Sequence, residues 1–216
     1  MKFDNISGRY DFLNHLLSLG QDYYWRAVMV RELGPSVGDR ILDLATGTGD
    51  SAKAIVERGI DVIGVDISFN MLLEAKQKIT GGHYQICSGS GYALPFKAET
   101  FSGATCAFGI RNMHETIKAL MEIHRVMKKG SKMAFLEFSM PRGMIKRPYS
   151  FYLSKILPFV AGLFSKREAY DYLADSIRKF YAAEEFAQLI VAAGFSRCEK
   201  KALSLGCVYI HIAYKD

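Results

Sequence analysis

The sequence lacks any long hydrophobic run, and this absence sets the first limit on the class of protein. No stretch of the 216 residues approaches the ~18–20 consecutive apolar residues that a membrane-spanning helix requires. The amino-terminal segment MKFDNISGRYD also lacks the apolar stretch of a signal peptide. We therefore expect a cytoplasmic protein that does not span a membrane.

Cysteine is scarce, and its spacing is irregular. None of the four cysteines belongs to a C-x-x-C motif, and all stand in apolar or strand-like segments: Cys87, Cys106, Cys198 and Cys207. Such surroundings favour buried free thiols over disulfides or a zinc site. No group of His, Cys and Asp residues has the spacing of metal ligands either, so no bound metal is expected.

Positive charge is in modest excess, because 28 Lys and Arg face 22 Asp and Glu, for a formal net charge of +6. Hydrophobic residues make up 50% and charged residues 23% of the chain, which is typical of a folded globule and excludes a disordered protein. The charge suits an anionic partner such as nucleic acid or an anionic membrane surface. Nucleic acid is disfavoured because the basic residues cluster with aliphatic ones and no RNA-binding module is visible.

What the sequence does contain is an alternation of strand-like and helix-like segments. Strands are predicted at 40–45, 61–67, 83–89, 103–109 and 131–139, with helical segments after the first, second and fourth of them. A last helix at 184–195 precedes two more strands, at 198–205 and 206–215. Strands joined by helices predict right-handed crossovers and a mostly parallel sheet.

The helix predicted at 114–130 is defined by apolar residues at helical spacing. These residues are expected on its inner side: Ile117, Leu120, Met121 and Val126. The helix is expected to end at a pair of lysines followed by Gly130, because basic residues and glycine favour a helix end.

The motif DLATGTGD, residues 43–50, follows a predicted strand and opens a helix. Gly47 and Gly49 allow the backbone to approach a ligand without side-chain collision. The G-x-G-x-x-G fingerprint and the P-loop lysine are both missing. Asp43 would repel a pyrophosphate, but it is able to hold an ammonium group directly or through water. The alternative is a purely structural turn with a helix-capping aspartate.

Asp66 ends the second predicted strand, 23 residues after Asp43. A carboxylate in that place is positioned to accept hydrogen bonds from ribose hydroxyls. An ammonium group and a ribose without a phosphate describe S-adenosylmethionine better than NAD.

The stretch FGIRNMHE, residues 108–115, ends the fourth strand in two strong hydrogen-bonding groups, Arg111 and Asn112. In a parallel sheet, ligands bind beyond the carboxyl ends of the strands, near the switch in strand order. We therefore expect both side chains to point into a ligand cleft. The alternative for Arg111 is an ion pair with Glu115 or with a carboxylate of the amino-terminal segment.

Several blocks together resemble the ubiquinone/menaquinone biosynthesis C-methyltransferase family. They are FDNISGRYDFLNHLLSLGQDYYWR, DLATGTGD, ALPF, FGIRN, LEFS, YDYLADSI and AGF, and they run in the family's order from Phe3 almost to the carboxyl terminus. The resemblance implies an α/β class I S-adenosylmethionine-dependent methyltransferase fold. Its Rossmann-like, mostly parallel seven-stranded sheet would be flanked by helices. It also implies methyl transfer to a ring carbon of a polyprenylated quinol precursor.

Carried over by position, the resemblance implies that Thr48 and Asp66 contact the cofactor, that Ser90 and Gly91 lie near its adenine, and that Ala107 lies beneath it. Three positions depart from the family pattern. Ser90 stands where Asp or Asn is usual, Ala107 where Ser is common, and Tyr181 where Pro follows the phenylalanine. A hydroxyl in place of a carboxylate or amide at position 90 would weaken the adenine contact by ~1 kcal/mol.

Methylation of a ring carbon needs a phenolate that directs electron density to that carbon and a route for the phenolic proton. Arg111 is expected to stabilise the phenolate, and Asn112 to donate a hydrogen bond to the other ring oxygen. His211, which matches a histidine that the family tends to keep, and His114 are candidates for carrying the proton. The alternative for His211 is a satisfied sheet residue without a role in the reaction. Tyr10 is a candidate for lining the substrate pocket.

Residues 142–180 form an aromatic and basic insertion in the single domain predicted over 1–216, and residues 1–35 are expected to form a helical cap. The insertion suits a membrane-peripheral lid for an isoprenoid-tailed substrate, or else an ordinary helical cap on the sheet. A homodimer is compatible with the sequence. Two rival functions stay open: methylation of another small-molecule or lipid acceptor, and a catalytically silent module that binds S-adenosylmethionine or quinol.

Overall fold

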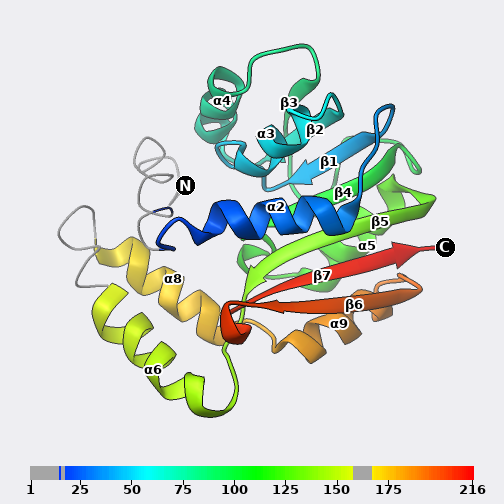
Figure 1. The fold of residues 1–216 in the computed structure, drawn as a ribbon. Helices are drawn as coiled ribbons and strands as arrows, with labels where there is room; N and C mark the ends of the chain where they lie inside the picture. Colours follow the sequence, from blue (N-terminus) through cyan, green and yellow to red (C-terminus); the bar gives the residue numbers. More distant parts are fainter. Residues whose placement is uncertain (1–14, 16–17, 158–166) are drawn as a thin grey trace.

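The chain forms a seven-stranded sheet in the order β3-β2-β1-β4-β5-β7-β6 (Figure 1). A computed structural model describes His15, residues 18–157 and residues 167–216, of which 167–171 are described by their backbone alone. The strands are β1 (Arg40–Leu44), β2 (Asp61–Asp66), β3 (Tyr84–Ser88), β4 (Phe101–Ala107), β5 (Met127–Phe138), β6 (Arg197–Leu203) and β7 (Val208–Lys215). Strands β1 to β5 pair in parallel, and β7 is antiparallel to both β5 and β6. The predicted fold class is confirmed.

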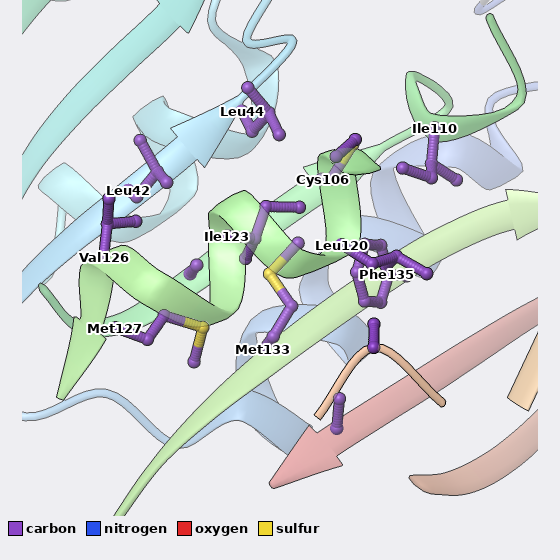
Figure 2. Close-up of a cluster of buried hydrophobic side chains, with 14 of the residues drawn as sticks. Leu42, Leu44, Cys106, Ile110, Leu120, Ile123, Val126, Met127, Met133 and Phe135 are labelled. Carbon is purple, nitrogen blue, oxygen red and sulfur yellow. The ribbon is translucent and has the colours of Figure 1, made fainter. Parts of the chain in front are cut away.

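Helices cover both faces of the sheet. They are α2 (Gln21–Leu33), α3 (Asp50–Val56), α4 (Phe69–Lys78), α5 (Thr116–Val126), α6 (Lys146–Phe151), α8 (Arg167–Lys179) and α9 (Ala183–Ala192). On one face, Trp25 and Met29 of α2 and Ile55 of α3 join a buried apolar cluster. On the other, Leu120 and Ile123 of α5 pack with residues of β1, β4 and β5 (Figure 2). Alternation of strands and amphipathic helices thus produces a three-layer core.

The strand order places the carboxyl ends of β1, β2 and β4 side by side. Strand β1 pairs with β2 on one side and with β4 on the other, so the order reverses between β1 and β4. Four short helical segments complete the chain: η1 (Ile110–Asn112), η2 (Gly143–Ile145), η3 (Tyr152–Ile156) and η4 (Ser204–Gly206). Figure 1 shows α6 and α8 next to one another beyond the carboxyl ends of the parallel strands. The site is therefore expected between these helices and the strand ends.

The end of the helix predicted at 114–130 was wrong. Helix α5 ends at Val126, and Met127 already pairs with Phe101 as the first residue of β5. Gly130 has a φ of 74° and lies in a stretch of β5 where the register with β4 shifts, so it serves a strand irregularity and not a helix end. The buried ammonium of Lys215 donates to the carbonyls of His124 and Met127, at 2.9 and 2.7 Å. A side chain from β7 thus satisfies backbone acceptors at the end of α5.

The inner side of α5 also differs from the prediction at two positions. Ile117 and Met121 are 39% and 58% exposed. The buried face instead comprises Thr116, Ala119, Leu120, Ile123 and Val126. The helix is therefore oriented with Leu120, Ile123 and Val126 toward the sheet, and Ile117 and Met121 lie on its outer side.

The structure bears on two expectations, that the cysteines are buried free thiols and that no helix spans a membrane. All four cysteines are free thiols, but only Cys106 is fully buried. No helix in the described ranges is both long enough and apolar enough to cross a bilayer.

Candidate functional site

The turn after β1 leaves open space above its first glycine. Gly47 and Gly49 have φ values of 56° and 86°, which L side chains rarely adopt. A Cβ added at Gly47 would meet no atom within 4 Å, whereas one at Gly49 would lie 2.8 Å from Ile79 and 3.0 Å from Ala75 of the α4 region. Gly49 is therefore required for packing, and Gly47 borders the space that a ligand could enter.

Asp43 supports this turn from below. Its carboxylate is 1% exposed and accepts hydrogen bonds from the hydroxyls of Thr46 at 2.6 Å and Thr105 at 2.7 Å. Burial raises the pKa of Asp43 to about 6, although both hydroxyls act in the opposite direction. Each oxygen keeps a further lone pair after these bonds. The contact of Asp43 with a ligand ammonium group stays a proposal.

The raised pKa of Asp43 predicts a pH-dependent stability. The folded protein holds the proton of Asp43 up to about pH 6, whereas the unfolded chain releases it near its ordinary value of 3.8. The free energy of unfolding should therefore fall as pH rises from about 4 to about 6. Asp43→Asn should remove this slope and stabilise the protein at pH 7 by about 3 kcal/mol at most. Urea unfolding across this pH range measures both effects.

The control for this prediction is Asp175→Asn, because Asp175 is an exposed carboxylate that pairs with Lys179 on α8. This variant should keep the wild-type slope. An unchanged slope in the Asp43 variant would show that the buried carboxylate does not control stability in this range.

Asp66 ties the end of β2 to the glycine turn. One carboxylate oxygen accepts the N–H of Gly47 at 2.9 Å, and the other accepts the N–H of Ser68 at 2.9 Å. Ser68 in turn caps α4, as its hydroxyl accepts the N–H of Met71. The carboxylate is thus held at the rim of the turn, next to the space above Gly47.

The residues proposed to hold the adenine and sugar follow the same edge. Thr48 lies in the glycine turn and is 4% exposed. Ser90 follows β3, and its hydroxyl accepts the N–H of Tyr92 at 3.3 Å. Gly91 lies close to Met113, because an added Cβ would be 3.1 Å from its sulfur. Ala107 is the last residue of β4. These positions are distributed along the carboxyl ends of β1, β3 and β4.

Arg111 forms an ion pair, but with a different partner from those predicted. Its Nη1 donates to Glu137 at 2.7 Å, whereas Glu115 pairs with Lys118 on the surface. The side chains of Arg111 and Glu137 are only 6% and 1% exposed. Arg111 also donates to the carbonyl of Phe108 through Nη1 and to the hydroxyl of Ser176 through Nε. Its guanidinium is therefore fixed from β5, from its own turn and from α8.

Glu137 accepts three hydrogen bonds around this ion pair: from the backbone N–H groups of Arg111 and Phe138, and from the Arg111 guanidinium. Burial raises the pKa of Glu137, and the charge of Arg111 opposes that rise. The Arg111 guanidinium carbon also lies 5.5 Å from the ring centroid of Phe138. No contact of Arg111 Nη2 is found among the described residues, so its two N–H groups are the donors left for a ligand.

Asn112 is oriented by the same helix. Its Oδ1 accepts a hydrogen bond from the hydroxyl of Tyr172 on α8 at 3.1 Å, and its Nδ2 lies 3.5 Å from the carbonyl of Phe108. Sequence reasoning assigned no role to Glu137, Tyr172 or Ser176. The signal was present, since all three fall in the blocks LEFS and YDYLADSI that carry the family resemblance.

The remaining predicted site residues do not join this group. His211 is 2% exposed, its Nε2 lies 2.9 Å from the carbonyl of Ala183, and its ring packs edge-on against Phe186 of α9. Burial lowers the pKa of His211 to about 4, which makes it a packed, neutral sheet residue at pH 7. His114 is exposed. Tyr10 lies outside the described residues.

A second polar cluster, which the sequence analysis did not foresee, lies where α2 meets α3. His15, Asp22 and Asp50 bring ligand-type atoms within 4.8 Å of one another. The same carboxylates already contact cations, because Arg26 donates to Asp22 at 2.9 Å and Lys78 donates to Asp50. These cations supply the charge that a metal would bring, so the cluster is an ion-pair network.

Comparison with known proteins identifies the family. The profile of the ubiE/COQ5 methyltransferase family matches residues 1–215. The "Ubiquinone/menaquinone biosynthesis C-methyltransferase UbiE" of Geobacter sulfurreducens is 40% identical, over 99% of this chain and 86% of that protein. The "Demethylmenaquinone methyltransferase" of Thermobifida fusca is 38% identical, over 99% and 93%.

The fold is shared more widely. A methyltransferase from Thermotoga maritima, described as a possible histamine N-methyltransferase, superposes with a TM-score of 0.70 at 20% identity, over 99% of this chain and 98% of that one. A likeness at that identity concerns the fold alone. The match along almost the whole sequence is what decides: this chain is a member of the ubiE/COQ5 methyltransferase family.

Proposed function

We propose that the protein transfers a methyl group from S-adenosylmethionine to a ring carbon of a polyprenylated quinol precursor, such as a demethylmenaquinol or a ubiquinone precursor. One observation carries the proposal. Asp66, bonded to the open glycine turn, ends β2, and Arg111 and Asn112 follow β4, which lies on the other side of β1 at the same edge of the sheet. This arrangement occurs in a chain whose curated relatives bear the names of quinone-biosynthesis C-methyltransferases.

The residues fit the cofactor in their chemistry. Gly47 leaves room against the backbone, Asp66 offers acceptors for ribose hydroxyls, and Ser90 and Gly91 lie at the end of β3 for the adenine. Asp43 places negative charge beneath the turn for an ammonium group. When bound, S-adenosylmethionine supplies an electrophilic methyl group.

At the substrate end, the protein must favour a phenolate over a phenol. The two N–H groups of Arg111 Nη2, which donate to no described residue, suit a developing ring oxyanion, because the guanidinium stays charged and its side chain is only 6% exposed. Asn112 Nδ2 suits the second ring oxygen, since Tyr172 occupies Oδ1 and turns the amide nitrogen away from itself. Methyl transfer to the ring carbon releases one proton, which we propose passes to solvent water, and we exclude His211 from the proposed mechanism because it packs against Ala183 and Phe186.

A polyprenyl tail requires an apolar neighbourhood, and the insertion presents one. Met144, Phe151 and Ile156 are 93%, 59% and 42% exposed. The exposed basic residues Lys146, Arg147 and Lys155 lie among them in sequence. Apolar side chains rimmed by cations suit peripheral contact with an anionic bilayer. We propose such contact at the inner membrane face; self-association stays a prediction that light scattering would test.

The function is tested by mixing the purified protein with methyl-labelled S-adenosylmethionine and a reduced demethylmenaquinone, or a ubiquinone precursor lacking the ring methyl group, in lipid vesicles. Mass spectrometry then locates the label. Label on a ring carbon supports the proposal, and the faster precursor identifies the quinol. Cofactor binding without labelled product would contradict it and favour another acceptor, while absence of both would favour a silent module.

A smaller effect is expected from the hydroxyl of Tyr172. Tyr172→Phe should lower kcat about 3- to 10-fold, because the Asn112 amide loses the donor that orients it. Cofactor affinity and thermal stability should stay near wild type. The matched control is Tyr181→Phe, at an exposed tyrosine whose ring contacts Phe180. Additive losses in the Tyr172→Phe/Asn112→Ala double variant would show that Tyr172 does not act through Asn112.

A further inference from the structure

One donor near the glycine turn has no acceptor. The Nε–H of Arg26 is buried, and no hydrogen-bond partner reaches it within the part of the chain that the structure describes. Arg26 belongs to the second turn of α2, and its side chain is 13% exposed. Buried N–H groups without an acceptor are rare in native proteins, because water satisfies them in the unfolded chain. An acceptor from outside the polypeptide would complete this position.

Arg26 extends to the place where the cofactor edge begins. Its guanidinium carbon lies 5.2 Å from the ring centroid of Phe108, which follows β4. Its Nη2 lies 3.9 Å from the carboxylate of Asp50, the residue after Gly49. Its charge also acts on Asp43, where it opposes the rise that burial causes in the pKa. Arg26 is thus placed between the carboxyl ends of β1 and β4.

The other cations near this edge are engaged more completely. Lys78 donates to Asp50. Arg111 uses Nη1 for Glu137 and Nε for Ser176, on the substrate side of β4. Within the described ranges, Arg26 donates a side-chain hydrogen bond only through Nη1, to Asp22 at 2.9 Å, and Asp22 is itself fixed by His15 and Ser18. The anchor holds the guanidinium in place before a ligand arrives, which reduces the entropy lost on binding.

We propose that Arg26 binds the carboxylate at the amino-acid end of S-adenosylmethionine. The inference rests on the proposed function, because it takes that cofactor as given. With the ribose at Asp66 and the adenine near Ser90, the amino-acid end extends toward the glycine turn and the end of β4, where Arg26 lies. A guanidinium fork matches a carboxylate in shape and charge. Neither the family resemblance nor the named relatives assign this contact.

The test compares two ligands that differ only in the carboxylate. Calorimetry measures the affinity of the full-length protein for S-adenosylmethionine and for its decarboxylated form, which keeps the adenosine, the sulfonium and the amine. Arg26→Gln should weaken S-adenosylmethionine binding about 10- to 100-fold. Its affinity for the decarboxylated ligand should equal that of the wild type. Arg31→Gln on the same helix, at an exposed arginine next to Glu32, should change neither.

Three results would overturn the assignment. Equal affinity of wild type and Arg26→Gln for S-adenosylmethionine would remove Arg26 from the site. An equal loss for both ligands would make Arg26 a structural residue of the ion-pair network with Asp22 and Asp50. Arg26→Lys keeps the positive charge and is the second variant to use if Arg26→Gln misfolds. It should recover part of the affinity for S-adenosylmethionine that Arg26→Gln loses. A wild-type protein that binds neither ligand would overturn the cofactor assignment itself, and Arg26 with it.

Discussion

Arg111→Ala should lower turnover on the order of 10²- to 10³-fold while leaving the affinity for S-adenosylmethionine close to wild type. The guanidinium lies at the substrate side of the strand ends, fixed by Glu137, Phe108 and Ser176 with Nη2 left over. Its proposed task is to stabilise negative charge that develops on the ring oxygen. That charge exists in the transition state more than in the bound substrate, so kcat should fall more than KM rises.

The measurement is steady-state kinetics with the reduced quinol in vesicles, combined with calorimetry of cofactor binding. Alanine also leaves Glu137 buried without its cation, so Arg111→Lys is needed as a second variant that retains the charge. Lysine lacks the planar fork and should recover only part of the activity. Arg31→Ala is the surface control. Wild-type turnover in a folded Arg111→Ala protein would remove Arg111 from the mechanism.

Glu137→Ala should reduce the free energy of unfolding by about 3–5 kcal/mol. The carboxylate is 1% exposed and accepts three hydrogen bonds, two from Arg111 and one from Phe138. Its removal leaves a guanidinium that is 6% exposed without a counter-ion. Urea unfolding at pH 7 measures the loss. Glu115→Ala, which breaks an exposed pair with Lys118, should change stability by less than about 1 kcal/mol.

Removing both charges separates stability from catalysis. The double variant Arg111→Met/Glu137→Leu should recover most of the lost stability, because an apolar pair of similar size carries no desolvation penalty. It should remain inactive. If Glu137→Ala unfolds at the same urea concentration as Glu115→Ala, the buried ion pair contributes nothing measurable to stability. A buried Arg111 guanidinium without its counter-ion would then not be destabilising, contrary to our inference.

The sequence was sufficient for the central strands because their burial is nearly continuous. Strands β1 and β4 are buried over most of their length, as expected for the centre of a parallel sheet. The start of α4 is also determined locally, since the hydroxyl of Ser68 caps the first turn of the helix. The boundary at Met127 was not. The letters MKKG suit a helix end, and only the pairing with Phe101 and the distant ammonium of Lys215 decide for a strand.

The sequence likewise predicted some residues of the candidate site and missed others. Asp43, Gly47 and Asp66 were predictable because each lies at or just after the end of a strand, and those strands are neighbours in the sheet. The partners that hold Arg111 and Asn112 were not, since Glu137, Tyr172 and Ser176 lie 26, 60 and 65 residues away from them. Local sequence cannot show which distant side chain will occupy a buried donor. Glu115 was named as an alternative ion-pair partner because it is the nearest carboxylate in the sequence.

The position of β7 has a consequence for synthesis on the ribosome. Strand β7, residues 208–215, lies between β5 and β6, although both are translated before it. A nascent chain that stops before Val208 therefore exposes an unpaired edge of β5 together with apolar surface. Such a chain is a substrate for chaperones or for edge-to-edge aggregation. The sheet can close only after β7 has been translated, so premature termination before Val208 should yield an unstable protein.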